Sequence, residues 1–190
     1  MSIFKTQGII IKIKKQEEKN NLYTIFTADY GKILTSKKLV LKEKTLDLGY
    51  LINFEIEVKQ GVNIHKIKNI KIIGEFNSFG KQYSIIHSFL ELLNIVNTKL
   101  PEKLTHLEIY YTLETLIKYE KLTSNELTKQ RIILIQLKLL DLLGTLNIEH
   151  ENVTIKKILH YIHKNKSGEI LKLTGINKEV EEKLEETVRN

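Results

Sequence analysis

The stretch LYTIFTADYGKI, at residues 22–33, predicts a β-hairpin, and the fold of the amino-terminal part can be worked out from it. Its first half, LYTIFT, is rich in the aromatic and β-branched residues that favour strands. The DYG sequence before Lys32 is a turn signal, because Gly31 accepts a positive φ without strain. Strand alternation puts one of Tyr23 and Phe26 in the core, and the sequence leaves open which one.

Further strand patterns lie on both sides of this hairpin. GIIIKIKK, at residues 8–15, predicts an apolar face of Ile9, Ile11 and Ile13 and a mostly basic face of Ile10, Lys12 and Lys14. LINFEIEV, at residues 51–58, predicts a core face of Ile52, Phe54, Ile56 and Val58. VNIHKIKNIKII, at residues 62–73, supplies the last strand. About five strands joined by short turns indicate a small, strongly curved antiparallel barrel or sheet.

The period of the apolar residues changes to a helical one after Gly80. YSIIHSFLELLNIV, at residues 83–96, predicts a helix, and Pro101 is expected to open a second. A third helix is expected from Thr123, which forms a capping box with Glu126, to a left-handed Gly144. Its stretch RIILIQLKLLDLLG is apolar on more than one side, which indicates a central helix, and two more helices follow. The sequence thus predicts an α+β protein with a β domain at residues 1–76 and an α-helical domain at residues 77–190.

The charge of the 190-residue chain is unevenly distributed. The formal net charge is +7, and residues 1–75 hold 14 lysines against 8 acidic residues, whereas the rest of the chain is nearly neutral. Genome bias alone would spread lysine evenly, so the excess favours a polyanionic partner for the β domain. The sequence has no cysteine, no long apolar run, and no basic segment leading into an apolar one at the amino terminus. We therefore expect a cytoplasmic protein that is not in the membrane.

The sequence has no motif that points to catalysis. It contains no phosphate-binding loop, nucleophile elbow or zinc-binding pattern. Glu55 and Glu57 fit a solvated strand face, and His150, His160 and His163 fit helix surfaces better than a zinc site. We therefore expect no enzyme activity, no metal and no cofactor.

The lysines of the β domain are the more informative feature. Ammonium groups on one curved face neutralise phosphates, and neighbouring aromatic rings stack on unpaired bases. Tyr30, at the bend of the hairpin, is the aromatic side chain that we expect to be exposed. The expected nucleic-acid-binding residues are Tyr30 and the lysines Lys12, Lys14, Lys15, Lys32, Lys37, Lys38, Lys42 and Lys44.

Two segments resemble the bacterial recombination mediator family RecO. The first segment is TQGIIIKIKK followed by LYTIFTADYGKI. It resembles the family's opening T-x-G-I-V-L strand and the l-x-x-l-f-T-x-x-x-G-K segment that comes after it. The matching residues are Thr6, Gly8, Ile9, Phe26, Thr27, Gly31 and Lys32. IQLKLLDLLG, at residues 135–144, resembles the family's F-E-L-R-L-L-E-L-L-G helix. The first loop, QEEKNN, and the segment TSKKLVLKEKT depart from the family pattern. The cysteine cluster of some members is missing, so the resemblance is to a short, zinc-free form.

This resemblance implies an oligonucleotide-binding-type (OB-fold-like) barrel followed by helices. It also implies a DNA-repair function without turnover chemistry: binding single- and double-stranded DNA, annealing strands coated by single-strand-binding protein (SSB), and helping RecR to load RecA. The resemblance suggests that the helical domain docks the acidic tail of SSB, and Lys129, Arg131 and Lys138 flank the matched helix. The alternatives are an adaptor that binds only proteins and an RNA-binding barrel.

Overall fold

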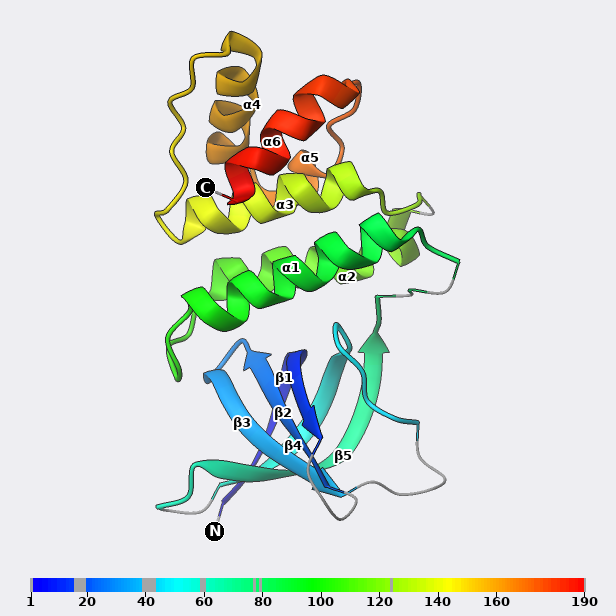
Figure 1. Ribbon diagram of the computed structural model, residues 1–190. Coiled ribbons are helices and arrows are strands. Elements are labelled where there is room, and N and C mark those ends of the chain that lie inside the picture. Colours follow the sequence, from blue (N-terminus) through cyan, green and yellow to red (C-terminus); the bar gives the residue numbers. More distant parts are fainter. Residues whose placement is uncertain are drawn as a thin grey trace. The chain divides into compact units, whose positions relative to one another are not determined.

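A computed structural model of the protein describes residues 2–15, 20–38, 44–58, 61–76, 78, 80–123 and 125–189. The chain forms two compact units (Figure 1). The first unit is Met1–Asn77 together with Val96–Tyr110, and the second is Ser78–Ile95 together with Tyr111–Asn190. The first unit therefore takes in the end of the first helix, the start of the second and the connection between them, in addition to the β strands.

The first unit is built on a closed five-stranded barrel with the strand order β1-β2-β3-β5-β4. The α+β prediction, with an OB-fold-like barrel followed by helices, is confirmed. Four of the strand pairs are antiparallel as predicted, whereas β3 and β5 pair in parallel, so the sheet is mixed. The strands are β1 (Ser2–Lys15), β2 (Asn20–Thr27), β3 (Gly31–Lys38), β4 (Leu51–Val58) and β5 (Ile64–Gly74).

The predicted hairpin at residues 22–33 is confirmed as the β2–β3 connection. Residues 28–30 form the turn, and Gly31 follows with a φ of 65°. The hydroxyl of Thr27 accepts a hydrogen bond from the Tyr30 amide and donates one to the Gly31 carbonyl. A three-residue loop followed by a residue in the left-handed conformation is a common hairpin geometry, and glycine adopts that conformation without strain.

The predicted face of Ile9, Ile11 and Ile13 is wrong, because β1 carries an irregularity in its pairing with β2. The register shifts between Ile10 and Lys12, so Ile10 pairs with Ile25 and Ile13 pairs with Tyr23. Ile10 therefore belongs to the barrel core and Ile13 packs against it. Such a bulge changes the face of every later residue. Lys12 and Lys14 still share a face, as predicted, but Ile10 does not lie there with them.

Side chains from all five strands and the segment before β4 form the barrel core. The predicted alternation of β4 is confirmed, since Ile52, Phe54 and Ile56 are buried in it and Val58 packs against it. Tyr23 is the ring that enters this core. Phe26 is also fully buried, but on the other face, where its ring lies 6.0 Å from that of Tyr110. Both rings are therefore packing residues, and neither is free to stack on a base.

The helices are α1 (Tyr83–Lys99), α2 (Leu107–Thr123), α3 (Lys129–Leu142), α4 (Val153–Lys164), α5 (Ser167–Ile170) and α6 (Lys178–Arg189). The prediction of a central helix is confirmed: Ile132–Leu140 of α3 are buried, and α3 packs against α4, α5 and α6. Gly144, with a φ of 68°, follows the end of α3 as predicted. No helix within the described ranges is long and apolar enough to cross a bilayer.

Two predicted helix starts are wrong. Pro101 does not open α2, because the backbone of the following residues bonds to the barrel: the Lys103 amide donates to the Lys32 carbonyl, and Lys103 has a φ of 60°. Thr123 does not open α3 either. It is the last residue of α2, where its hydroxyl donates to the Tyr119 carbonyl, and Thr128 is the N-cap of α3. Local capping patterns do not record which backbone groups already have partners.

Candidate nucleic-acid interface

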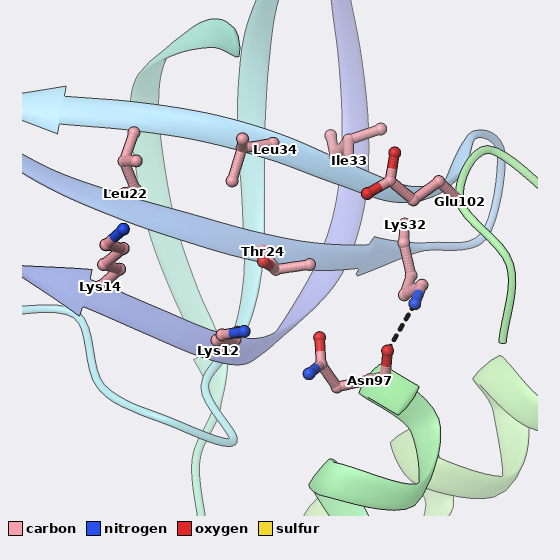
Figure 2. Close-up of a pocket in the computed structure, with 9 residues that line it drawn as sticks. All are labelled: Lys12, Lys14, Leu22, Thr24, Lys32, Ile33, Leu34, Asn97 and Glu102. Carbon is pink, nitrogen blue, oxygen red and sulfur yellow. Dashed lines mark hydrogen bonds between the residues drawn. The ribbon is translucent and has the colours of Figure 1, made fainter. Parts of the chain in front are cut away.

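A groove of about 430 Å³ lies on the outer face of β1, β2 and β3 (Figure 2). We call it the β1–β3 groove. Three of the lysines predicted to bind phosphate line it, together with apolar side chains from β2 and β3 and two residues from the end of α1 and the segment that follows. The lining residues are Lys12, Lys14, Leu22, Thr24, Lys32, Ile33, Leu34, Asn97 and Glu102.

The register of the three strands brings the lysines of β1 to this groove. Lys12 pairs with Thr24, which pairs with Leu34, and Lys14 pairs with Leu22 in the next row. Residues paired across a sheet point to the same face, so the groove has a basic edge on β1 and an apolar centre on β2 and β3. Lys12 and Lys14 are both exposed. This edge depends on the bulge in β1, which sets the face of both lysines.

Lys32 differs from the other lysines because it is buried, with 7% of its surface exposed. Its ammonium group donates a 2.6 Å hydrogen bond to the carbonyl of Asn97, in the last turn of α1 (Figure 2). Burial lowers the pKa of Lys32 from its usual 10.5, and the positive charge of Lys12 acts in the same direction, while Glu102 opposes them. Lys32 therefore belongs to the wall of the groove, where it joins β3 to α1, and is not an exposed side chain as the sequence had suggested.

The groove combines the two features that single-stranded nucleic acid requires. The ammonium groups of Lys12 and Lys14 can neutralise phosphates along the edge. The apolar surface of Leu22 and Leu34 can lie against a base, which buries its flat face away from water. The outer face of strands 2 and 3 is also where OB-fold barrels bind oligonucleotides.

A second basic pocket, of about 670 Å³, lies between β3 and β5. We call it the β3–β5 pocket. Leu46, Ile67 and Ile72, which form or pack against the barrel core, provide its floor. Its lysines are Lys37, Lys38, Lys44 and Lys68.

Acidic side chains lie close to Lys44 and to Lys68. The Lys44 ammonium lies 2.7 Å from a Glu75 carboxylate oxygen, a hydrogen bond that raises the pKa of Lys44, and it also lies over the ring of Tyr50. Lys68 forms an ion pair with Glu57. The remaining predicted lysines lie elsewhere: Lys15 is exposed at the end of β1 and lines neither pocket, and Lys42 lies outside the described residues.

Tyr30 is exposed at the hairpin bend, as predicted, and it has an aromatic neighbour. Its ring, with 38% of the residue exposed, lies 6.3 Å from that of Phe4, which is 43% exposed. The Thr6 hydroxyl donates a 2.7 Å hydrogen bond to the carboxylate of Asp29, the residue before Tyr30. The two rings therefore form a small exposed aromatic surface on the barrel, outside both basic pockets.

The cations predicted to meet an acidic tail are engaged within the second unit. Lys129 lies 2.5 Å from a Glu185 carboxylate oxygen. Arg131 donates to the carbonyls of Leu171 and Glu126 and lies over the ring of Tyr119.

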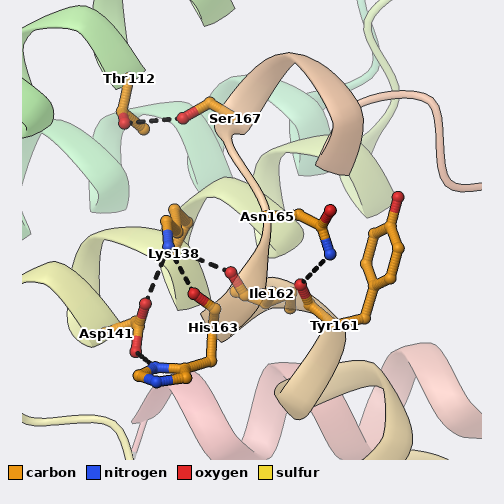
Figure 3. Close-up of polar contacts among 8 residues, drawn as sticks. All are labelled: Thr112, Lys138, Asp141, Tyr161, Ile162, His163, Asn165 and Ser167. Atoms are coloured by element: carbon orange, nitrogen blue, oxygen red, sulfur yellow. Dashed lines mark hydrogen bonds and ion pairs between the residues drawn. The ribbon is translucent and has the colours of Figure 1, made fainter.

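Lys138, the third of these cations, is only 8% exposed and is an internal residue of the second unit. Figure 3 shows its polar contacts. Its ammonium group donates to Asp141 and to the carbonyls of Ile162 and His163 at the end of α4. Carbonyls in the last turn of a helix have no partner within their own helix, so the buried lysine satisfies these two.

The histidines and acids considered as metal ligands do not converge. His163 contacts Asp141 at 2.7 Å, and His160 lies 3.8 Å from Glu149. Within the described part of the chain, no group of three or more histidine or acidic side chains is arranged to hold a metal ion.

Several residues of the interface were missed by the sequence analysis. Lys68 lies in the last predicted strand and lines the β3–β5 pocket. The alternation of lysine and isoleucine around Ile67 is the sequence signal that could have marked it as a surface cation. Phe4 precedes the first predicted strand, which in fact begins at Ser2. Asn97 and Glu102 come from the helical part of the sequence, and no local pattern connects them with β3.

No protein-family model matches the chain, and the curated proteins contain no significant match to it. The resemblance to the RecO family therefore rests on the motifs quoted above.

Proposed function

We propose that this protein binds single-stranded nucleic acid in the β1–β3 groove, and that it acts as a DNA-binding recombination mediator in DNA repair. The observation that carries the proposal is the groove itself, in which two exposed lysines border an apolar centre on the face that OB-fold barrels use for oligonucleotides. The charge excess of the amino-terminal part supports it. The choice of DNA over RNA, and of annealing as the activity, is supported by the resemblance to RecO.

The proposed mechanism needs no bond to be made or broken by the protein. Lys12 and Lys14 hold phosphates, so that counterions are released and the repulsion between two strands falls. The apolar centre of the groove holds a base loosely and without reading its sequence, because every base has a flat apolar face. A strand held mainly by its backbone keeps most of its bases available for pairing with a complementary strand.

The resemblance also provides the proposed setting. The protein would act in the cytoplasm, with double-stranded DNA, the acidic tail of SSB and RecR as further partners. Of the three cations first considered for the SSB tail, Lys129 and Arg131 remain candidates, and each would have to exchange an internal contact for the tail. We propose no metal, cofactor or enzymatic reaction.

The test is fluorescence anisotropy of a labelled single-stranded DNA oligonucleotide, titrated with the protein at several salt concentrations. We expect the logarithm of the binding constant to fall linearly with the logarithm of salt, by roughly 0.7 per phosphate contacted. The double variant Lys12→Glu/Lys14→Glu should bind at least tenfold more weakly and with a smaller salt slope.

The matched control is Lys121→Glu/Lys157→Glu, which makes the same change of charge at two exposed helix positions in the second unit. This control should bind nearly as tightly as the wild type. Equal losses in the two double variants would mean that net charge alone drives binding. Absence of binding at low salt by a folded sample would instead support the protein-only adaptor, and tighter binding of an RNA competitor would support the RNA-binding barrel.

A further inference from the structure

The two basic pockets of the first unit share one strand, β3. Ile33 and Leu34 line the β1–β3 groove, and Lys37 and Lys38 line the β3–β5 pocket. At about 3.3 Å per residue, the step from Leu34 to Lys37 is only about 10 Å along the strand. The two pockets have no lining residue in common, but they lie on successive strands of the barrel, since β3 pairs with β2 on one side and with β5 on the other.

The β3–β5 pocket resembles the groove in combining lysines with apolar side chains. Lysines surround an apolar floor, here formed by Leu46, Ile67 and Ile72. Lys44 and Lys68 are held by Glu75 and Glu57, and Lys37 and Lys38 bring two further cations from the end of β3. Lysines with an apolar floor suit phosphates with a base between them, as they do in the groove.

We infer that the β3–β5 pocket is a second subsite for the same nucleic-acid strand, which crosses the barrel from β1 over β2 and β3 to β5. This inference rests on the proposed function and extends it, because the path runs past the face of strands 2 and 3 that OB-fold barrels use. The short step along β3 favours one continuous strand over two separate ones. The ligand is a single strand long enough to reach both pockets, held by its phosphates at Lys12 and Lys14 and again at Lys37 and Lys38.

The path predicts that the contribution of the second subsite depends on the length of the strand. OB folds bind about 4–16 nucleotides, so the probes are oligothymidylates of about 4 and about 16 nucleotides. The short probe fits one pocket, and the longer one spans both. The variant Lys37→Glu/Lys38→Glu should bind the short probe within about twofold of the wild type, because the groove is intact, but should bind the long probe at least tenfold more weakly.

The salt dependence and the stoichiometry provide independent readouts. For the long probe, the salt slope of Lys37→Glu/Lys38→Glu should fall by roughly 0.7 for each phosphate that the variant no longer neutralises. Native mass spectrometry should find one long strand per protein molecule. Lys121→Glu/Lys157→Glu again controls for net charge, and thermal unfolding checks that each variant is folded.

The outcomes separate this inference from the proposed function. If the wild type binds neither probe at low salt, the proposed function fails. If the wild type binds both probes but Lys37→Glu/Lys38→Glu affects neither, or affects both equally, the second subsite is overturned and the proposed function stands. Two long strands on one protein molecule would overturn the continuous path, since the pockets would then be separate sites for two strands.

Discussion

The backbone of Leu104 lies so close to Gly31 that a β-carbon on Gly31 would be 2.3 Å from the Leu104 carbonyl oxygen. This contact joins the β2–β3 hairpin to the connection between α1 and α2, within the first unit. It makes Gly31 necessary for two reasons: its φ of 65° disfavours other residues, and the adjacent backbone leaves no room for a side chain.

Replacing Gly31 by alanine should therefore destabilise the protein strongly. We expect the free energy of unfolding to fall by roughly 2–4 kcal/mol, from the left-handed backbone and from overpacking together. Urea unfolding measures the change. Gly61→Ala is the matched control, because Gly61 has a φ of 77° but nothing within 4 Å of the added carbon, so its cost should be only about 1 kcal/mol. Equal costs at the two positions would contradict the contact with Leu104.

Tyr30 should contribute to binding without contributing much to stability. If its exposed ring stacks on a base, Tyr30→Ala should lose about 1 kcal/mol of binding energy, a rise in Kd of about fivefold, while Tyr30→Phe keeps the affinity. Anisotropy with single-stranded DNA measures both variants. Tyr83→Ala removes an exposed ring from α1 instead and should leave Kd unchanged. Unaltered binding by Tyr30→Ala would restrict the interface to the basic pockets.

The burial of Lys32 predicts a pH effect on stability. Since its pKa is lower in the folded protein than its ordinary 10.5, the unfolded chain binds more protons between those two values, and stability rises with pH in that window. The wild type should thus gain stability relative to Lys32→Met as pH rises toward 10.5. Urea unfolding of both proteins in alkaline buffers tests this. A difference that stays constant or shrinks would mean that the Lys32 ammonium is well solvated.

The contribution of Asp141 to the stability of the protein should instead be lost in acid. Burial disfavours its charge, but hydrogen bonds from His163 and Lys138 outweigh burial, so its pKa lies below its usual 3.8 (Figure 3). Its contribution is present above that value and is lost as pH falls through the lower, folded pKa. Asp141→Asn should cost roughly 1–2 kcal/mol at neutral pH, because Lys138 loses a charged partner, and the difference from the wild type should vanish in strong acid.

The control for Asp141 is Glu149→Gln. The hydrogen bond from Lys156 lowers the pKa of Glu149 as well, but this pair is exposed, where water screens the interaction. Urea unfolding of Glu149→Gln should therefore show little change at neutral pH. A loss as large as that of Asp141→Asn would contradict the role assigned to burial around Lys138.

Much of the fold could be predicted because its signals are local. The turn chemistry at Tyr30 and Gly31 specified the hairpin, the alternation from Ile52 to Val58 specified β4, and the apolar run of α3 specified a buried helix. Each of these patterns lies within a short stretch of the chain. The spacing of apolar residues along the chain is therefore sufficient to predict these elements.

The tertiary structure alone decided which polar groups remain on the surface. The bulge near Ile11 set the face of Lys12 and Lys14, and the backbone bond from Lys103 to Lys32 delayed the start of α2. Lys32 is buried because its ammonium group donates a hydrogen bond to the Asn97 carbonyl, 65 residues away in the sequence. Lys138 is buried where it donates to the Ile162 carbonyl at the end of α4. The sequence by itself determined the strands, the central helix and the concentration of positive charge. Whether each lysine is buried or exposed depended on hydrogen-bond acceptors that only folding brings near. A buried ammonium group is tolerated only where such acceptors replace water.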